Sequence, residues 1–174
     1  MPTFKAVITA ATITISVDSP AAAFEIVGSS ESSSVQLIEI AQELDNWLDA
    51  NSPYPRAELP LGKIAFVAPE TVVNYNGQAT QLDEFTRGLY DKDAETIYLV
   101  EPWDANDAFD RSVLLHELAH HRQAKAKHWY CDHAQEWDAY RLQAAFLEDE
   151  NVDYKFNWAL IVLESSCAKR DVHP

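Results

Sequence analysis

The sequence predicts an α+β fold, with a short N-terminal β-sheet followed by a helical C-terminal half. Three observations support this class. An amphipathic helical pattern comes first, β-branched and aromatic runs bounded by turn residues follow, and long helical patterns close the chain. A chain of 174 residues is the size of one domain, and its 47% hydrophobic residues are enough to form a core.

The first 23 residues predict a secretory signal peptide. Lys5 supplies a positive charge, residues 6–17 form a weakly apolar run, and Ala21-Ala22-Ala23 offers the small-x-small cleavage pattern. Cleavage is expected before Phe24, which leaves a single domain over residues 24–174. The alternative for the same residues is an N-terminal strand, because they contain several isoleucines and threonines. The signal predicts a secreted or periplasmic protein.

The first half of the mature chain predicts one helix and a few short strands. A helix over Val35–Asn51 carries an apolar stripe, with Ser34 as its expected N-cap. Lys63–Ala68 is a β-branched and aromatic run between Gly62 and Pro69. Gly88–Asp91 and Thr96–Val100 flank a polar turn and predict a hairpin.

The second half predicts three helices. Asp132 followed by Gln135 three positions later is a capping-box pattern, which predicts that a helix begins at about His133. The expected helices cover residues 108–127, 133–148 and 158–164.

The charge balance excludes several partners. Thirteen basic against 28 acidic residues give a net charge of −15. Nucleic-acid binding needs a basic surface, and an anionic membrane repels an acidic protein. Beyond the signal, no stretch approaches the roughly 20 apolar residues of a membrane span, so we expect no membrane anchor after cleavage.

The segment His116-Glu117-Leu118-Ala119-His120 carries the chemistry. Residues four apart on a helix project from the same side, so His116 and His120 can bind one metal ion. Glu117 lies about 100° around the helix from His116, where it can reach a water molecule without ligating the metal. Leucines surround the motif and indicate a buried segment, where unpaired polar groups would be costly.

The third ligand is expected on the following helix. Gln123 and Ala126 stand where one class of H-E-x-x-H protease has glycine and a third histidine, so that class is excluded. Glu136, sixteen positions after His120, is our first candidate. The other candidates for the third ligand are His133, Asp132, Asp138 and Cys131.

With these residues the chain resembles the gluzincins, zinc metallopeptidases whose third ligand is a glutamate on a following helix. Glu136-Trp137-Asp138-Ala139 matches their E-x-x-A motif, and the resemblance extends over residues 95–147. Many gluzincins carry an aspartate four residues after that glutamate, where this chain has Tyr140. Asp138 or another carboxylate would then have to orient the ligand histidine. The chain is also similar to small secreted bacterial proteins described only as domains of unknown function.

The resemblance implies zinc-dependent hydrolysis of a peptide or protein substrate. One Zn²⁺ per chain would be held by His116, His120 and Glu136, with Glu117 as the general base. The strand at residues 96–100 is expected at the edge of the cleft, where it could pair with an extended peptide. The candidates for stabilising the oxyanion are Tyr130, His133, Tyr140 and Tyr154.

Two further expectations concern the cysteines and the function class. Cys131 and Cys167 can form one disulfide in an oxidising compartment, which would fix the C-terminus beside the helix of Glu136. The alternative to a peptidase is a non-catalytic, zinc-stabilised binding module. Glu117 favours the enzyme, because a purely structural zinc site needs no base.

Overall fold

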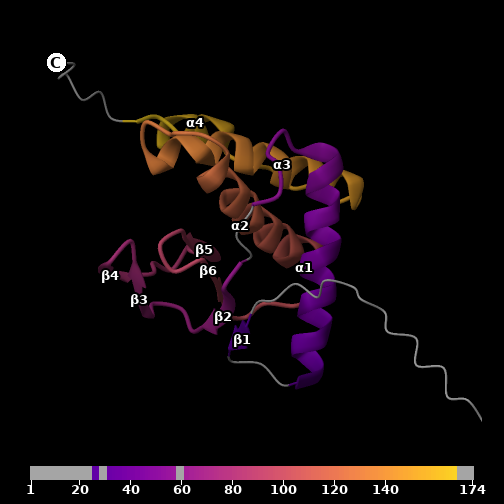
Figure 1. Ribbon diagram of the computed structural model, residues 1–174. Coiled ribbons are helices and arrows are strands. Elements are labelled where there is room, and N and C mark those ends of the chain that lie inside the picture. Colours follow the sequence, from indigo (N-terminus) through magenta and orange to yellow (C-terminus); the bar gives the residue numbers. More distant parts are fainter. Residues whose placement is uncertain (1–24, 28–30, 58–60, 168–174) are drawn as a thin grey trace, which may run out of the picture.

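The computed structural model describes residues 25–27, 31–57 and 61–167 (Figure 1). The predicted signal peptide over residues 1–23 and its cleavage position before Phe24 lie outside these residues. Among the residues described, no helix is long and apolar enough to cross a membrane.

A four-stranded sheet forms one layer of the domain. Its order is β1 (Glu25–Val27), β2 (Lys63–Val67), β6 (Thr96–Val100) and β5 (Gly88–Asp91). The first three strands are parallel, and β5 runs antiparallel to β6. A separate hairpin joins β3 (Val72–Tyr75) to β4 (Gln78–Gln81). The mixed sheet with flanking helices confirms the predicted α+β class.

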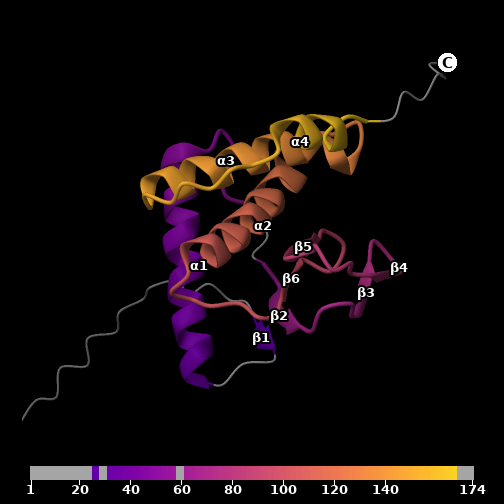
Figure 2. The same cartoon turned by 180° about the vertical axis from the view of Figure 1, so that it is seen from behind.

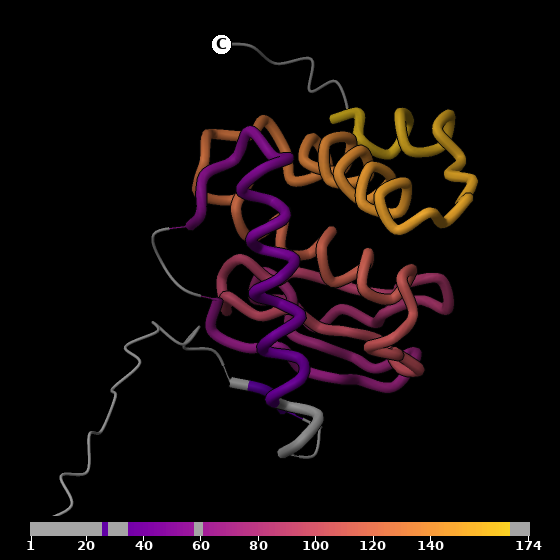
Figure 3. Tube along the Cα trace, turned by 90° about the vertical axis from the view of Figure 1, so that its right-hand side faces the viewer, coloured from indigo at the N-terminus to yellow at the C-terminus, as the bar shows by residue number. Residues whose placement is uncertain are grey.

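Within the described residues, four α-helices complete the fold. They are α1 (Glu31–Asn51), α2 (Ala108–Ala126), α3 (Glu136–Asp149) and α4 (Trp158–Glu164). Helix α2 lies between the sheet on one side and the α3–α4 pair on the other, while α1 runs along the edge of these layers (Figures 1 and 2). The tube view from the side shows the same stacking (Figure 3).

The core lies where α1, α2, α3 and the sheet meet. Leu44 and Leu48 of α1, Ile64 and Ile97 of the sheet and Leu114 of α2 are almost fully buried there. Burial of large aliphatic side chains is the main stabilising contribution to a fold of this size. Helix α2 contacts α1, α3 and the strands β5 and β6, so it lies at the centre of the fold.

The structure corrects three local predictions. Helix α1 begins at Glu31 and not at Val35, so Ser34 lies within the helix and is not its N-cap. The predicted capping box does not form: residues 132–135 make a 3₁₀ turn without a side-chain cap, and α3 begins at Glu136. Strand β6 is an interior strand, so the prediction that Thr96–Val100 forms the edge was wrong. The edge strand beside the helices is β5.

The predicted disulfide between Cys131 and Cys167 is present, with Cα atoms 5.9 Å apart. Cys131 immediately precedes the 3₁₀ turn that leads into α3, and Cys167 follows α4. The bridge therefore connects the start of α3 to the end of α4. Such a cross-link restricts the unfolded chain and stabilises the folded one.

Candidate metal centre

Helix α2 presents the H-E-x-x-H motif from the interior of the domain. Asp107 caps the helix by accepting a hydrogen bond from the backbone N–H of Asp110, which satisfies a donor of the first turn. Two turns later, His116, Glu117 and His120 are only 7%, 6% and 9% exposed. Their burial follows from the position of α2 between two layers, and polar groups there need partners.

Glu136, the first residue of α3, completes a three-residue cluster. Its carboxylate oxygens lie 3.3 Å from His116 Nε2 and 3.4 Å from His120 Nε2. The two Nε2 atoms are 3.0 Å apart. Among the described residues, these three form the one group of histidine, cysteine and carboxylate side chains arranged to hold a metal ion.

The cluster fits a zinc ion in its size and in its donor atoms. Ligand atoms about 2.0–2.1 Å from a tetrahedral zinc lie roughly 3.3–3.4 Å from one another, close to the separations seen here. Two imidazoles and one carboxylate are also the ligand set of many zinc enzymes. Two imidazole lone pairs facing each other at 3.0 Å repel unless a cation or a proton lies between them.

Two glutamines determine which nitrogen of each histidine faces the cluster. Gln143 Oε1 is 3.1 Å from His116 Nδ1, and Gln123 Oε1 is 2.9 Å from His120 Nδ1. An amide oxygen only accepts, so each Nδ1 carries a proton, and Nε2 is the atom that each histidine turns to the centre. Gln143 is itself held by donating to Ser112 Oγ, and Gln123 by donating to the carbonyl of Gln135.

The electrostatics of the cluster favour a cation at its centre. Burial raises the pKa of Glu136, but hydrogen bonds from His116 and His120 outweigh it and hold the pKa well below its usual range. Burial lowers the pKa of His120, and the hydrogen bond and charge of Glu136 reverse this and raise it to about 9. Without a metal, a proton shared by these groups compensates the Glu136 charge; a divalent ion can replace it.

Glu117 lies beside the cluster without joining it. The backbone N–H of Tyr90 donates a hydrogen bond to its carboxylate, and burial raises its pKa although the two histidines of the cluster lower it. A Cβ on Gly88 would lie 2.7 Å from Glu117 Oε1 and 2.9 Å from Val113 Cγ1. Glycine at this position therefore lets the edge strand β5 approach α2 closely enough to enclose Glu117.

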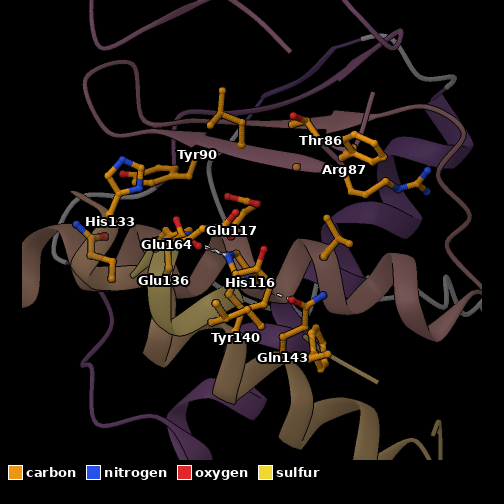
Figure 4. Close-up of a pocket in the computed structure, with 18 of the residues that line it drawn as sticks. Thr86, Arg87, Tyr90, His116, Glu117, His133, Glu136, Tyr140, Gln143 and Glu164 are labelled. Atoms are coloured by element: carbon orange, nitrogen blue, oxygen red, sulfur yellow. Dashed lines mark hydrogen bonds and ion pairs between the residues drawn. The ribbon is translucent and has the colours of Figure 1, made fainter. Parts of the chain in front are cut away.

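A cavity of about 830 Å³ opens in front of Glu117 and the cluster. The residues before β5 and β5 itself form one wall, α2 and α3 form the floor, and residues 154–164 form the opposite wall. Figure 4 shows Tyr90, Glu117 and His116 facing this space, with Gln143 behind His116. Glu117 and the three residues of the cluster thus border the same open cavity.

The other candidates for the third ligand are placed elsewhere or have other partners. His133 lines the cavity but does not belong to the cluster. Asp132 forms an ion pair with Lys92 at 2.7 Å. Asp138 accepts a hydrogen bond from the Tyr54 hydroxyl, so it does not orient a ligand histidine as we expected.

The structure also distinguishes the last ligand candidate, Cys131, and the tyrosine candidates for stabilising the oxyanion. Cys131 is bonded to Cys167 and has no thiolate to offer a metal. Among the oxyanion candidates, Tyr130 is 91% exposed and does not line the cavity. Tyr140 and Tyr154 do line it. The ring of Tyr140 also lies edge-on to that of His116, with centroids 4.5 Å apart.

Sequence reasoning missed Gln123, Gln143 and Gly88. Gln123 lies three residues after His120, which places it on the same face of α2. Gln143 lies seven residues after Glu136, which places it on the same face of α3. Those spacings were the available signal for the glutamines. Nothing in the sequence indicated that Gly88 would meet Glu117, because that contact joins a strand to a helix.

Fold and site together define an α+β domain with a buried two-histidine, one-glutamate cluster beside an open cavity. The chain belongs to the family described as Domain of unknown function (DUF6647), whose model matches residues 33–174. No curated protein and no solved structure matches the chain.

Proposed function

We propose that this protein is a zinc-dependent peptidase that acts in the periplasm or outside the cell. The observation that carries the proposal is the cluster of His116, His120 and Glu136 with the separate, buried carboxylate of Glu117 beside it. The H-E-x-x-H and E-x-x-A motifs, which resemble those of gluzincins, support the same reading. The disulfide and the predicted signal peptide support a location in an oxidising compartment.

The two glutamine-oriented histidines and Glu136 would hold the ion. Zinc bound there would polarise the scissile carbonyl group and lower the pKa of a water molecule towards neutrality. The chain's own contribution is a set of ligands whose orientation is fixed in advance by Gln123 and Gln143. Fixed ligands leave little reorganisation to be made when substrate binds.

Glu117 would act as the general base. Its raised pKa brings the carboxyl group closer to the range in which it can both accept and return a proton near neutral pH. It would take a proton from the attacking water at its carboxylate and pass it to the leaving amine. The hydrogen bond from the Tyr90 N–H keeps the carboxylate turned towards β5 and the cavity.

Tyr140 is the best-placed donor to the substrate's carbonyl oxygen. Burial and the nearby charges of Glu136 and Glu117 raise its pKa to about 12, so the phenol keeps its proton at neutral pH. Among the described residues its hydroxyl has no hydrogen-bond partner, while its ring is held against His116. A protonated, unpaired hydroxyl at the cavity can donate to a developing negative charge.

The edge of β5 offers a place for an extended peptide. Val100 N–H donates to Arg87 O, so alternate residues of this strand bond to β6, and Gly88 and Tyr90 turn their backbone groups outward. The Tyr90 N–H is used by Glu117, so a substrate could pair with the backbone groups of Gly88 and with the Tyr90 carbonyl. With a net charge of −15, we expect no nucleic-acid substrate.

The test compares wild type with Glu117→Gln and His116→Ala, measuring bound zinc and hydrolysis of a peptide library. Glu117→Gln should keep its zinc and lose about 10²–10⁴-fold in hydrolysis, the usual contribution of a general base. His116→Ala should lose both. A wild type that binds zinc but cleaves no peptide would refute the peptidase and favour the zinc-stabilised binding module.

A further inference from the structure

One face of α4 forms part of the cavity wall. Asn157, Leu160, Ile161 and Glu164 all line the cavity, with the spacing of a single helical face. Three of these four side chains are apolar or neutral, and Glu164 carries the one negative charge. Figure 4 shows Glu164 on the same side of the cavity as Glu136 and Tyr140.

Glu164, whose side chain is exposed to solvent, differs from the other charged residues of the cavity because no described residue pairs with it. Within the described part of the chain it makes no hydrogen bond and no ion pair, although residues 168–174 are not described. The cations of the cavity are all paired already: Arg87 with Asp110, Lys92 with Asp132, and Lys155 with Asp153. The carboxylate of Asp83 accepts hydrogen bonds from Phe85 and Thr86.

The surroundings of Glu164 suit the two parts of a basic side chain. Lysine and arginine have an apolar stem and a charged tip, and they place the stem along apolar surface. Leu160 and Ile161 provide such a surface on the same helix face. Tyr140 lines the same cavity, and aromatic rings attract cations.

We propose that the wall formed by Leu160, Ile161, Tyr140 and Glu164 is a subsite for a cationic group of the substrate, an ammonium or guanidinium, which pairs with the Glu164 carboxylate. This rests on the proposed peptidase function and names its substrate class as basic peptides. The net charge of −15 would also draw such peptides towards the protein. The disulfide supports the geometry, because Cys167 follows Glu164 by three residues and anchors this end of α4.

The test measures binding, so that it does not depend on hydrolysis. Zinc-loaded Glu117→Gln protein is titrated with alanine-based hexapeptides that carry one lysine, norleucine or glutamate at each position in turn. Each peptide is made with a free and with an acetylated amino-terminus. We expect the best lysine peptide to bind about two- to fivefold more tightly than its norleucine counterpart.

Substitutions at Glu164 identify the carboxylate responsible. Adding Glu164→Gln should abolish the lysine preference, and Glu164→Lys should reverse it in favour of glutamate peptides. Glu148→Gln removes the same charge from an exposed position of α3 outside the cavity and should leave the preference intact. The acetylated series tests the lysine ammonium alone, because both peptides of each pair then lack the amino-terminal ammonium, and the preference should be retained there.

Equal binding of lysine and norleucine peptides would overturn the subsite, as would a preference that survives Glu164→Gln. Weaker zinc binding in Glu164→Gln, measured against a chelator, would also overturn it, since the carboxylate would then belong to the metal centre. The two proposals fail separately. A Glu164-dependent preference in a protein that cleaves no peptide keeps the subsite and refutes the peptidase. Cleavage without the preference keeps the peptidase and refutes the subsite.

Discussion

The contact between Gly88 and Glu117 allows the position of the proposed base to be perturbed without substituting Glu117 itself. In Gly88→Ala, the new Cβ would lie 2.7 Å from Glu117 Oε1, whereas ordinary contact begins at 3.4 Å. The carboxylate oxygen must therefore retreat by about 0.7 Å or β5 must move away from α2. A displacement of about 1 Å at a reacting group can lower a rate by roughly 10²-fold.

We expect Gly88→Ala to retain zinc, to lose about 10- to 100-fold in kcat/KM, and to be destabilised by about 1–3 kcal/mol. The stability cost arises because the Glu117 carboxylate must turn aside and the buried Val113 Cγ1, 2.9 Å from the new Cβ, must also give way. The assay combines zinc content, denaturant unfolding and hydrolysis of a peptide that the wild type cleaves.

Gly62→Ala is the matched control. Its Cβ would lie 3.1 Å from the carbonyl oxygen of Glu95, a tight contact that involves no residue of the site. It should lose stability but keep its rate. Full activity in Gly88→Ala, or an equal loss of activity in Gly62→Ala, would refute the argument that Gly88 positions Glu117.

Three further predictions follow from the contacts of the site and the core. Gln143→Leu should weaken zinc binding about 10- to 100-fold in a chelator competition, because His116 loses the acceptor that fixes its tautomer; unchanged affinity would contradict this role. Replacing Cys131 and Cys167 with serine should lower the free energy of unfolding by roughly 3–4 kcal/mol, since the bridge closes a loop of 36 positions. Unfolding of oxidised and double-mutant proteins in urea measures the difference, and equal midpoints would argue against it. Burial raises the pKa of Glu95, but hydrogen bonds from Lys125 and Tyr90 outweigh it and lower the pKa below the usual 4.5. A lowered folded-state pKa stabilises above the unfolded value, so the advantage of wild type over Glu95→Gln should be complete above about pH 4.5 and shrink as the pH falls further. Denaturant unfolding of both proteins at pH 7 and pH 3 tests this, and a difference that does not shrink on acidification would refute it.

Several elements were predictable because their signals are local. The last helix has the predicted bounds, Trp158–Glu164, and the strands of the β5–β6 hairpin are also as expected. The β3–β4 hairpin was missed although Asn76 and Gly77 form its turn with positive φ angles of 50° and 75°. Asn-Gly is a strong signal for such a turn, but the polar strands beside it offered no clear alternation.

The order of strands could not be predicted in the same way. Thr96–Val100 is apolar along its length, which fits the interior position that β6 occupies between two neighbours. Strand pairing depends on contacts between residues distant in the chain, and a hairpin alone does not show which of its strands pairs further. The cleft edge was therefore assigned to the wrong strand of a correctly predicted hairpin.

By itself, the sequence determined what depends on helix periodicity. Four-residue spacing on one helix places His116 and His120 side by side wherever that helix lies, and it keeps Glu117 to one flank. Only the tertiary structure decided which carboxylate joins the two histidines and which glutamines orient them. It also decided that β5, through Gly88, packs against Glu117. Those contacts join separate elements, so they are set by how α2, α3 and the sheet pack and not by any local pattern.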